Sequence, residues 1–108
     1  MSLPAEHTFT VKHEGQELSL TFTMPTMRQR TKIGLAEARM REGVPAEDLD
    51  PLTRSLIAQL CYLTETVTSP DGISFNESTD PFLMNEVYQE VLGYESRFLG
   101  DRDPNQDS

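Results

Sequence analysis

Residues 50–70 contain the feature that most constrains the fold, an amphipathic segment bounded by a helix start and a helix stop. Asp50 is a favourable N-cap residue, and Pro51 suits the first helical position because its missing N–H is not needed there. Pro70 disfavours helical geometry in the residue before it, which predicts that the helix ends at residue 69. Large apolar residues recur every three or four positions and share one face: Leu52, Leu56, Leu60, Leu63 and Val67. Other elements must cover that face.

Residues 8–23 alternate between apolar and polar side chains on either side of Glu14-Gly15, which predicts a β-hairpin. With a two-residue turn at this dipeptide, Phe9 faces Leu20 and Val11 faces Leu18, so the apolar side chains share one face. A lone hairpin is only marginally stable in water, so we expect this face to pack on helices. The hairpin also leaves at least one strand edge open to pairing with an added strand.

A second helix is predicted over residues 26–42, because Thr26 and Gln29 have the spacing of a capping box and Gly43 suits the position after the last turn. This helix carries two weakly apolar stripes on nearly opposite sides. One stripe consists mostly of small residues, which allow close packing within the domain: Met27, Thr31, Gly34, Leu35 and Ala38. The other stripe and its flanking arginines form the predicted partner-binding surface: Arg30, Ile33, Ala36, Met40 and Arg41. The alternative is that both stripes are buried within the domain.

A third helix is predicted over residues 81–99, where Asp80-Pro81 repeats the Asp-Pro start seen at residue 50 and Gly100 is expected to end the helix. Apolar residues on the facing sides of the helices are expected to form the core: Leu56, Leu60, Leu63, Val87, Val91, Tyr94 and Phe98. The predicted fold class is α+β, with an N-terminal β-hairpin followed by a small bundle of three helices. The predicted organisation is a flexible N-terminus (1–7), one domain (8–99) and a disordered acidic tail (100–108).

The composition excludes several classes of function. The chain of 108 residues has a formal net charge of −9, which argues against nucleic-acid binding because phosphates attract basic residues. Positive charge concentrates in residues 27–42, where five basic residues accompany two acids. No segment approaches the roughly 20 apolar residues of a membrane span, and the N-terminus lacks the features of a signal peptide. We therefore expect a soluble protein of the cytoplasm that binds neither nucleic acid nor membrane.

Three side chains could in principle carry chemistry, but their setting supports none. His7 and His13 have no acidic or thiol third ligand nearby in the sequence, so a metal site is not expected. Cys61 lies on the flank of the central helix without a base near it, as expected for a small buried apolar residue. We therefore predict that the protein is not an enzyme and that it binds no cofactor.

The segment Phe22-Thr23-Met24-Pro25-Thr26-Met27-Arg28-Gln29, placed directly after a hairpin, resembles a junction found in the tail assembly chaperones of long-tailed bacteriophages. Members of this family are similar in having a short N-terminal hairpin, a Met-Pro-Thr type junction and a few helices in a small acidic protein. The resemblance implies a phage or prophage chaperone that coats the tape-measure protein, helps to recruit tail-tube subunits and forms homo-oligomers. It also implies action in the cytoplasm of the bacterial host and absence from the mature virion.

A tape-measure protein is long and helical, and its apolar stripes are exposed until the tail tube encloses it. A small acidic protein with shallow apolar stripes between charges would shield those stripes and keep the complex in solution. The alternative interpretation is a small acidic phage or bacterial adaptor or inhibitor that binds a host protein. Binding to tape-measure fragments distinguishes the two.

Overall fold

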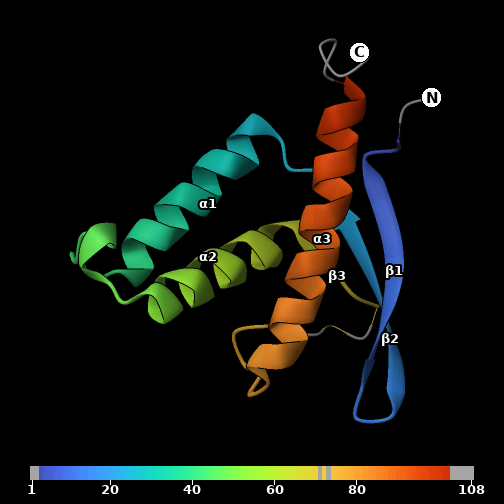
Figure 1. Cartoon of the computed structure of the whole chain (residues 1–108), viewed down its shortest axis with the longest axis horizontal. Helices are drawn as coiled ribbons and strands as arrows, with labels where there is room; N and C mark the ends of the chain where they lie inside the picture. Colours follow the sequence, from blue (N-terminus) through green and yellow to red (C-terminus); the bar gives the residue numbers. More distant parts are fainter. Residues whose placement is uncertain (1–2, 71, 73, 103–108) are drawn as a thin grey trace.

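The computed structural model describes residues 3–70, 72 and 74–102. In chain order its elements are β1 (Glu6–His13), β2 (Gln16–Thr23), α1 (Met27–Met40), the short 3-10 helix η1 (Ala46–Asp48), α2 (Pro51–Thr66), β3 (Val67–Thr68) and α3 (Pro81–Arg102). Figure 1 shows α3 lying along the hairpin while α1 and α2 extend to the other side. The predicted α+β fold, a hairpin followed by three helices, is confirmed.

The hairpin has the predicted register. Phe9 pairs with Leu20 and Val11 with Leu18 in an antiparallel ladder without interruption. The turn residues Glu14 and Gly15 both have positive φ, 51° and 78°. Two central residues of this kind are typical of a type I′ turn, whose twist matches that of the flanking strands. The ladder begins at Glu6, so the first strand is two residues longer than predicted.

A third strand was not predicted. Helix α2 ends at Thr66, and the next two residues pair antiparallel with β2, Val67 with Phe22 and Thr68 with Thr21. The prediction that Val67 lies on the helix is therefore wrong. β-branched residues favour strands, and the unpaired side of β2 offers backbone partners at this point. The sheet order is β1-β2-β3, which leaves β1 as one outer strand.

Helix α1 begins with the predicted capping box. The Gln29 N–H donates to the Thr26 hydroxyl at 3.2 Å, and the Thr26 N–H donates to the Gln29 side-chain oxygen at 2.9 Å. The helix ends at Met40, two residues earlier than predicted. Glu42 and Gly43 both adopt positive φ, 51° and 87°, so the chain leaves the helix through two consecutive left-handed residues.

Helix α3 begins where predicted but ends later. The Asp80 carboxylate accepts hydrogen bonds from the N–H groups of Phe82 and Leu83, which caps the first turn. The helix continues through Gly100 to Arg102, so the prediction that Gly100 ends it is wrong. Of the predicted tail at 100–108, residues 103–108 lie outside the described part of the chain.

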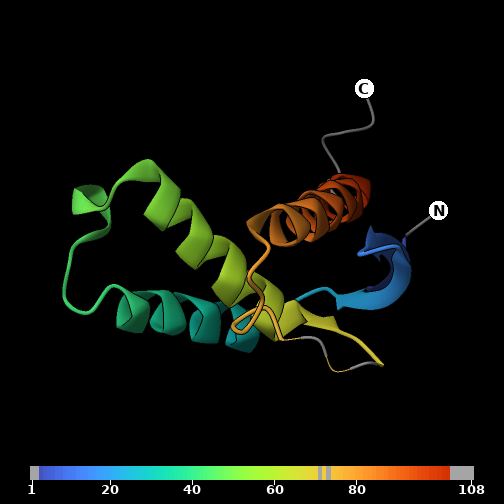
Figure 2. The same cartoon turned by 90° about the horizontal axis from the view of Figure 1, so that it is seen from below.

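The main core lies between α3 and the inner face of the sheet, with contributions from α2 and the segment before α3 (Figure 2). Its buried members are Phe9, Val11, Leu20, Phe22, Leu63, Phe75, Leu83, Met84, Val87, Val91, Tyr94 and Phe98. The predicted burial of Leu63 and of the four α3 residues is confirmed. The prediction for Leu56 and Leu60 is only partly right, since both are half-buried.

Helices α1 and α2 form a pair that extends away from this core (Figures 1 and 2). Among the described residues, none from α1 belongs to the main core. At the far end of α2, Leu52 is 68% exposed although it lies on the predicted apolar stripe. The helices cross, so α3 covers only the part of that stripe near the sheet.

The Asp50 cap of α2 is expected to make stability depend on pH. The Thr53 hydroxyl donates to one oxygen of the Asp50 carboxylate at 2.6 Å and the Thr53 N–H to the other at 3.0 Å. These hydrogen bonds, the hydroxyl's first, lower the pKa of Asp50 below its ordinary 3.8. The carboxylate's contribution is therefore fully present above pH 3.8 and is lost as the pH falls through the lowered folded pKa.

Urea unfolding of the wild type and of Asp50→Ala at a series of pH values measures this contribution. We expect a stability gap at neutral pH that shrinks in acid. Asp50→Asn is the control, because its amide can cap the helix but cannot titrate in this range. A gap between wild type and Asp50→Ala that is the same at neutral and acid pH would contradict the cap's electrostatic role.

Candidate functional site

Most of the predicted partner stripe of α1 is turned toward the rest of the protein. Ile33 is only 8% exposed, and Ala36 is half-buried on the same side of α1. The Cys61 thiol of α2 donates a hydrogen bond to the Sδ atom of Met40 at 3.5 Å. Ile33 and Ala36 therefore pack within the domain, contrary to the expectation for this stripe, whereas Met40 stays 45% exposed. Cys61 is buried as predicted.

The two flanking arginines are also engaged within the chain. The Arg30 guanidinium lies 2.9 Å from the Glu95 carboxylate of α3. Arg41 is half-buried and borders a hollow between α1 and α2 that Leu49, Arg54 and Ile57 also line. The structure thus brings the predicted site residues together along one side of α1, but on the side that holds α1 to the rest of the protein.

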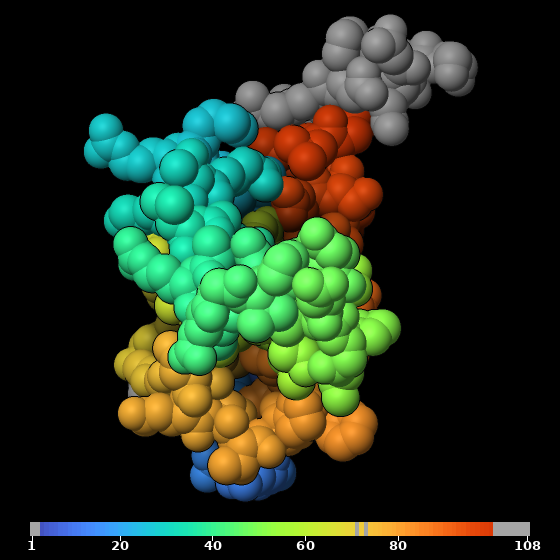
Figure 3. All heavy atoms as spheres, turned by 90° about the vertical axis from the view of Figure 1, so that its left-hand side faces the viewer, coloured from blue at the N-terminus to red at the C-terminus, as the bar shows by residue number. Residues whose placement is uncertain are grey.

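The outward side of α1 is the stripe of small residues. Met27 is 75% exposed and Leu35 is 54% exposed, and Thr31, Gly34 and Ala38 are exposed between them. Figure 3 shows α1 lying across this face of the molecule beside the start of α2. Large apolar side chains gain the most from burial, roughly 1.5–3 kcal/mol each. Of the large apolar residues of α1, Ile33 is buried, while Met27, Leu35 and Met40 stay exposed.

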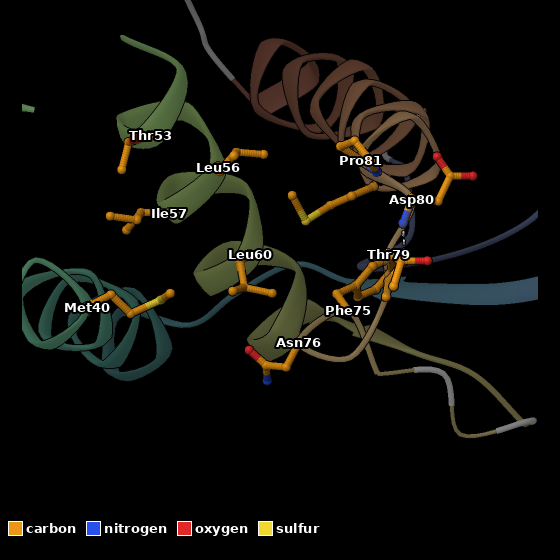
Figure 4. A pocket seen from close by; sticks show the side chains of 12 residues that line it. Met40, Thr53, Leu56, Ile57, Leu60, Phe75, Asn76, Thr79, Asp80 and Pro81 are labelled. Atoms are coloured by element: carbon orange, nitrogen blue, oxygen red, sulfur yellow. Dashed lines mark hydrogen bonds between the residues drawn. The ribbon is translucent and has the colours of Figure 1, made fainter. Parts of the chain in front are cut away.

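An apolar groove lies where α1, α2 and the start of α3 meet, with a volume of about 300 Å³ (Figure 4). We call this hollow the junction groove. Its apolar lining consists of Met40, Leu56, Ile57, Leu60, Phe75, Pro81 and Met84. Polar side chains at its rim are Thr53, Asn76, Ser78, Thr79 and Asp80. Segments far apart in the sequence thus combine into one apolar surface.

Two large exposed apolar side chains lie close in the sequence to groove residues. Leu52 lies one helical turn before Leu56 on the same face of α2, and it is 68% exposed. Phe82 directly follows Pro81 in the first turn of α3 and is 83% exposed. Exposed leucine and phenylalanine next to an apolar hollow are typical of a protein-binding surface. The sequence pattern places Leu52 on the apolar stripe of the helix but does not identify Phe82 or the groove.

The titratable side chains have structural roles. His7 stacks on Tyr94 at 4.2 Å between ring centroids, and its Nε2 atom is 3.1 Å from the Glu90 carboxylate. His13 lies 3.5 Å from Asp80, so both histidines connect β1 to α3. Within the described residues, no group of three or more histidine, cysteine or acidic side chains could hold a metal ion.

The buried hydroxyl and thiol groups are disfavoured as nucleophiles. Burial raises the pKa of Cys61, and the nearby Glu37 carboxylate adds to the effect. Burial and then the hydrogen bond to Glu95 raise the pKa of Tyr62 far above its ordinary range. Both groups therefore remain protonated near neutral pH.

No protein-family model, curated protein or solved structure matches the chain. No helix in the described part of the chain is long and apolar enough to cross a lipid bilayer. The observations that bear on function are therefore the junction groove, the exposed residues Leu52 and Phe82, and the segment between the hairpin and α1 at residues 22–29.

Proposed function

We propose that this protein is a phage tail assembly chaperone without enzymatic activity, which binds an apolar stripe of the helical tape-measure protein in the junction groove. The resemblance of residues 22–29 suggests the family, and the groove supplies a surface suited to the role. The proposal includes recruitment of tail-tube subunits, self-association, and action in the cytoplasm of the host before the virion is complete.

The junction groove with Leu52 and Phe82 beside it is the observation that carries this proposal. Its volume of about 300 Å³ is at the lower end of the range for small-molecule pockets, roughly 300–1,000 Å³. It suits one or two anchoring side chains of a partner helix.

The charge distribution suits a solubilising role. Residues 43–108 carry three arginines against thirteen acids, and the groove rim includes Asp80. Charge of one sign keeps protein complexes apart in solution. A chain that covers the apolar stripe of a long helix at one surface, and presents acids elsewhere, would keep the loaded helix from aggregating.

The test measures binding to fluorescently labelled helical fragments of the tape-measure protein encoded in the same genome. Leu52→Asp places a charge one turn from Leu56 on α2, and Phe82→Asp places one next to Pro81 in the first turn of α3. Neither disturbs the core, because both side chains are exposed. We expect each to weaken binding at least about tenfold, equivalent to about 1.4 kcal/mol. The measurement is fluorescence anisotropy with the full-length chain.

Met27→Asp is the matched control, because Met27 is 75% exposed but lies on the outward face of α1, away from the groove lining. It should bind like the wild type. Weakened binding by Met27→Asp alone would place the partner on α1 instead. If the wild type binds no tape-measure fragment, the chaperone proposal fails, and the adaptor or inhibitor interpretation becomes the better one.

A further inference from the structure

The outer edge of β1 is a second surface, separate from the junction groove. β1 has eight residues, pairs with β2 without a bulge and contains no proline. It is the outer strand of the sheet, and Figure 1 shows no other described element beyond it. Exposed edges of this length are usually protected, because their unpaired N–H and C=O groups can pair with a strand of another chain.

The hairpin register shows which backbone groups face outward. His13 and Gln16 flank the two-residue turn, so they form a hydrogen-bonded pair. Hydrogen-bonded and non-bonded pairs alternate along an antiparallel ladder. The odd-numbered residues of β1 therefore bond to β2, and the N–H and C=O groups of the even-numbered residues point to the outer edge. These residues are Glu6, Thr8, Thr10 and Lys12.

This outer edge is complementary to itself. If a second copy of β1 pairs antiparallel about Phe9, Glu6 of each copy lies opposite Lys12 of the other, and Thr8 lies opposite Thr10. All four positions are even-numbered, so every opposed pair has its N–H and C=O groups directed at the other strand. Opposite charges facing each other across strands stabilise pairing, and like charges oppose it.

Other registers with the correct hydrogen-bond directions lose this match. A shift by two residues toward the turn places Glu6 opposite Glu14, and a shift the other way places Lys12 opposite Pro4, which has no N–H to donate. Only the register centred on Phe9 satisfies the backbone groups and both charged ends together. The buried face continues across the two copies, with Phe9 opposite Phe9 and His7 opposite Val11.

We propose that two copies of this chain associate through their β1 edges into one continuous sheet, in the register that pairs Glu6 with Lys12. The contact is symmetric, because the same strand of each copy takes both roles. It uses the sheet and leaves the junction groove free in each copy. The inference names the contact for the self-association that the proposed function includes. Its test needs no tape-measure fragment, so dimerisation can fail while tape-measure binding succeeds, and the reverse.

Charge reversal followed by charge exchange tests the proposal in the full-length chain. Lys12→Glu and Glu6→Lys each place like charges opposite one another at both ends of the paired strands. We expect each single variant to weaken dimerisation by roughly tenfold or more. The double variant Glu6→Lys/Lys12→Glu exchanges the charges and restores the match, so it should dimerise nearly as well as the wild type. Sedimentation equilibrium over a range of concentrations measures the dissociation constants.

Mixing the two single variants is a second arm of the same experiment. Each supplies the charge that the other lacks, so the mixture should form dimers more tightly than either variant alone. Thr10→Pro removes an outward N–H without removing a bond to β2, and it should abolish dimerisation. Circular dichroism verifies that each variant is folded. If Thr10→Pro is unfolded, the charge variants alone decide whether the β1 edges form the dimer contact.

A wild type that stays monomeric at every concentration measured overturns the proposal. Dimerisation that is equally strong in the single and double variants also overturns it, because the contact then lies elsewhere. Weakening in both single variants and recovery in the double variant and in the mixture support it, since no general destabilisation would be reversed by exchanging the two charges. Rising salt should weaken the wild-type dimer.

Discussion

Leu63→Ala is expected to lower the free energy of unfolding by about 2–5 kcal/mol. Leu63 has no exposed surface and is the one fully buried leucine that α2 contributes to the core between α3 and the sheet. Truncation removes apolar contacts and leaves a cavity that rigid neighbours fill only in part. Urea denaturation with an unchanged m-value measures the loss as a shift of the midpoint.

Leu60→Ala is the matched control for this prediction, because it makes the same change one turn away on the same helix. Leu60 is half-buried and lines the junction groove, so its truncation opens space that water already reaches. We expect a clearly smaller loss of stability than for Leu63→Ala. An equal or larger loss for Leu60→Ala would show that the core does not lie where the structure places it.

The sequence alone predicts the register of the hairpin, because a period of two leaves no freedom in how the strands pair. Once Glu14-Gly15 is the turn, a one-residue slip would send Phe9 and Val11 to the solvent face. Helix starts are equally predictable, since Thr26 and Asp50 cap through contacts within four residues. These features depend on local chemistry, which a sequence displays directly.

The sequence does not reveal features that depend on distant partners. Val67 continues the helical spacing of α2, yet it pairs with Phe22 because β2 offers its unpaired side there. Gly100 suits a helix stop, but the helix continues past it. Leu52 belongs to the apolar stripe, but α2 and α3 cross, and the stripe extends beyond the region that α3 covers.

The candidate site was the least predictable part. The two stripes of α1 are both weakly apolar, and the choice between them depends on which one α2 meets. Side-chain size does not decide the orientation, because Met27 and Leu35 of the exposed stripe are as large as the buried Ile33. The junction groove could not be predicted, because it combines residues of α1, α2 and α3 with the segment before α3. Its composition follows from the tertiary arrangement alone.

The Glu95 carboxylate connects all three helices. It accepts hydrogen bonds from the Arg30 guanidinium of α1, at 2.9 Å, and from the Tyr62 hydroxyl of α2. Its side chain is 13% exposed, whereas that of Arg30 is 34% exposed. Arg30 is therefore partly solvated, and removing it alone is expected to cost no more than about 1 kcal/mol. Removing the carboxylate leaves two donors without their shared acceptor.

Glu95→Ala is therefore expected to lower the free energy of unfolding by about 1.5–3 kcal/mol, more than Arg30→Ala does. Since α1 contributes nothing to the main core among the described residues, this contact also anchors its first turns. Amide hydrogen exchange should accelerate in α1 more than in α3. Glu86→Ala removes an exposed acid of α3 and should change stability by no more than about 0.5 kcal/mol. If Glu95→Ala and Glu86→Ala are equally stable and α1 exchanges no faster in Glu95→Ala, then α1 is held by its packing on α2 alone.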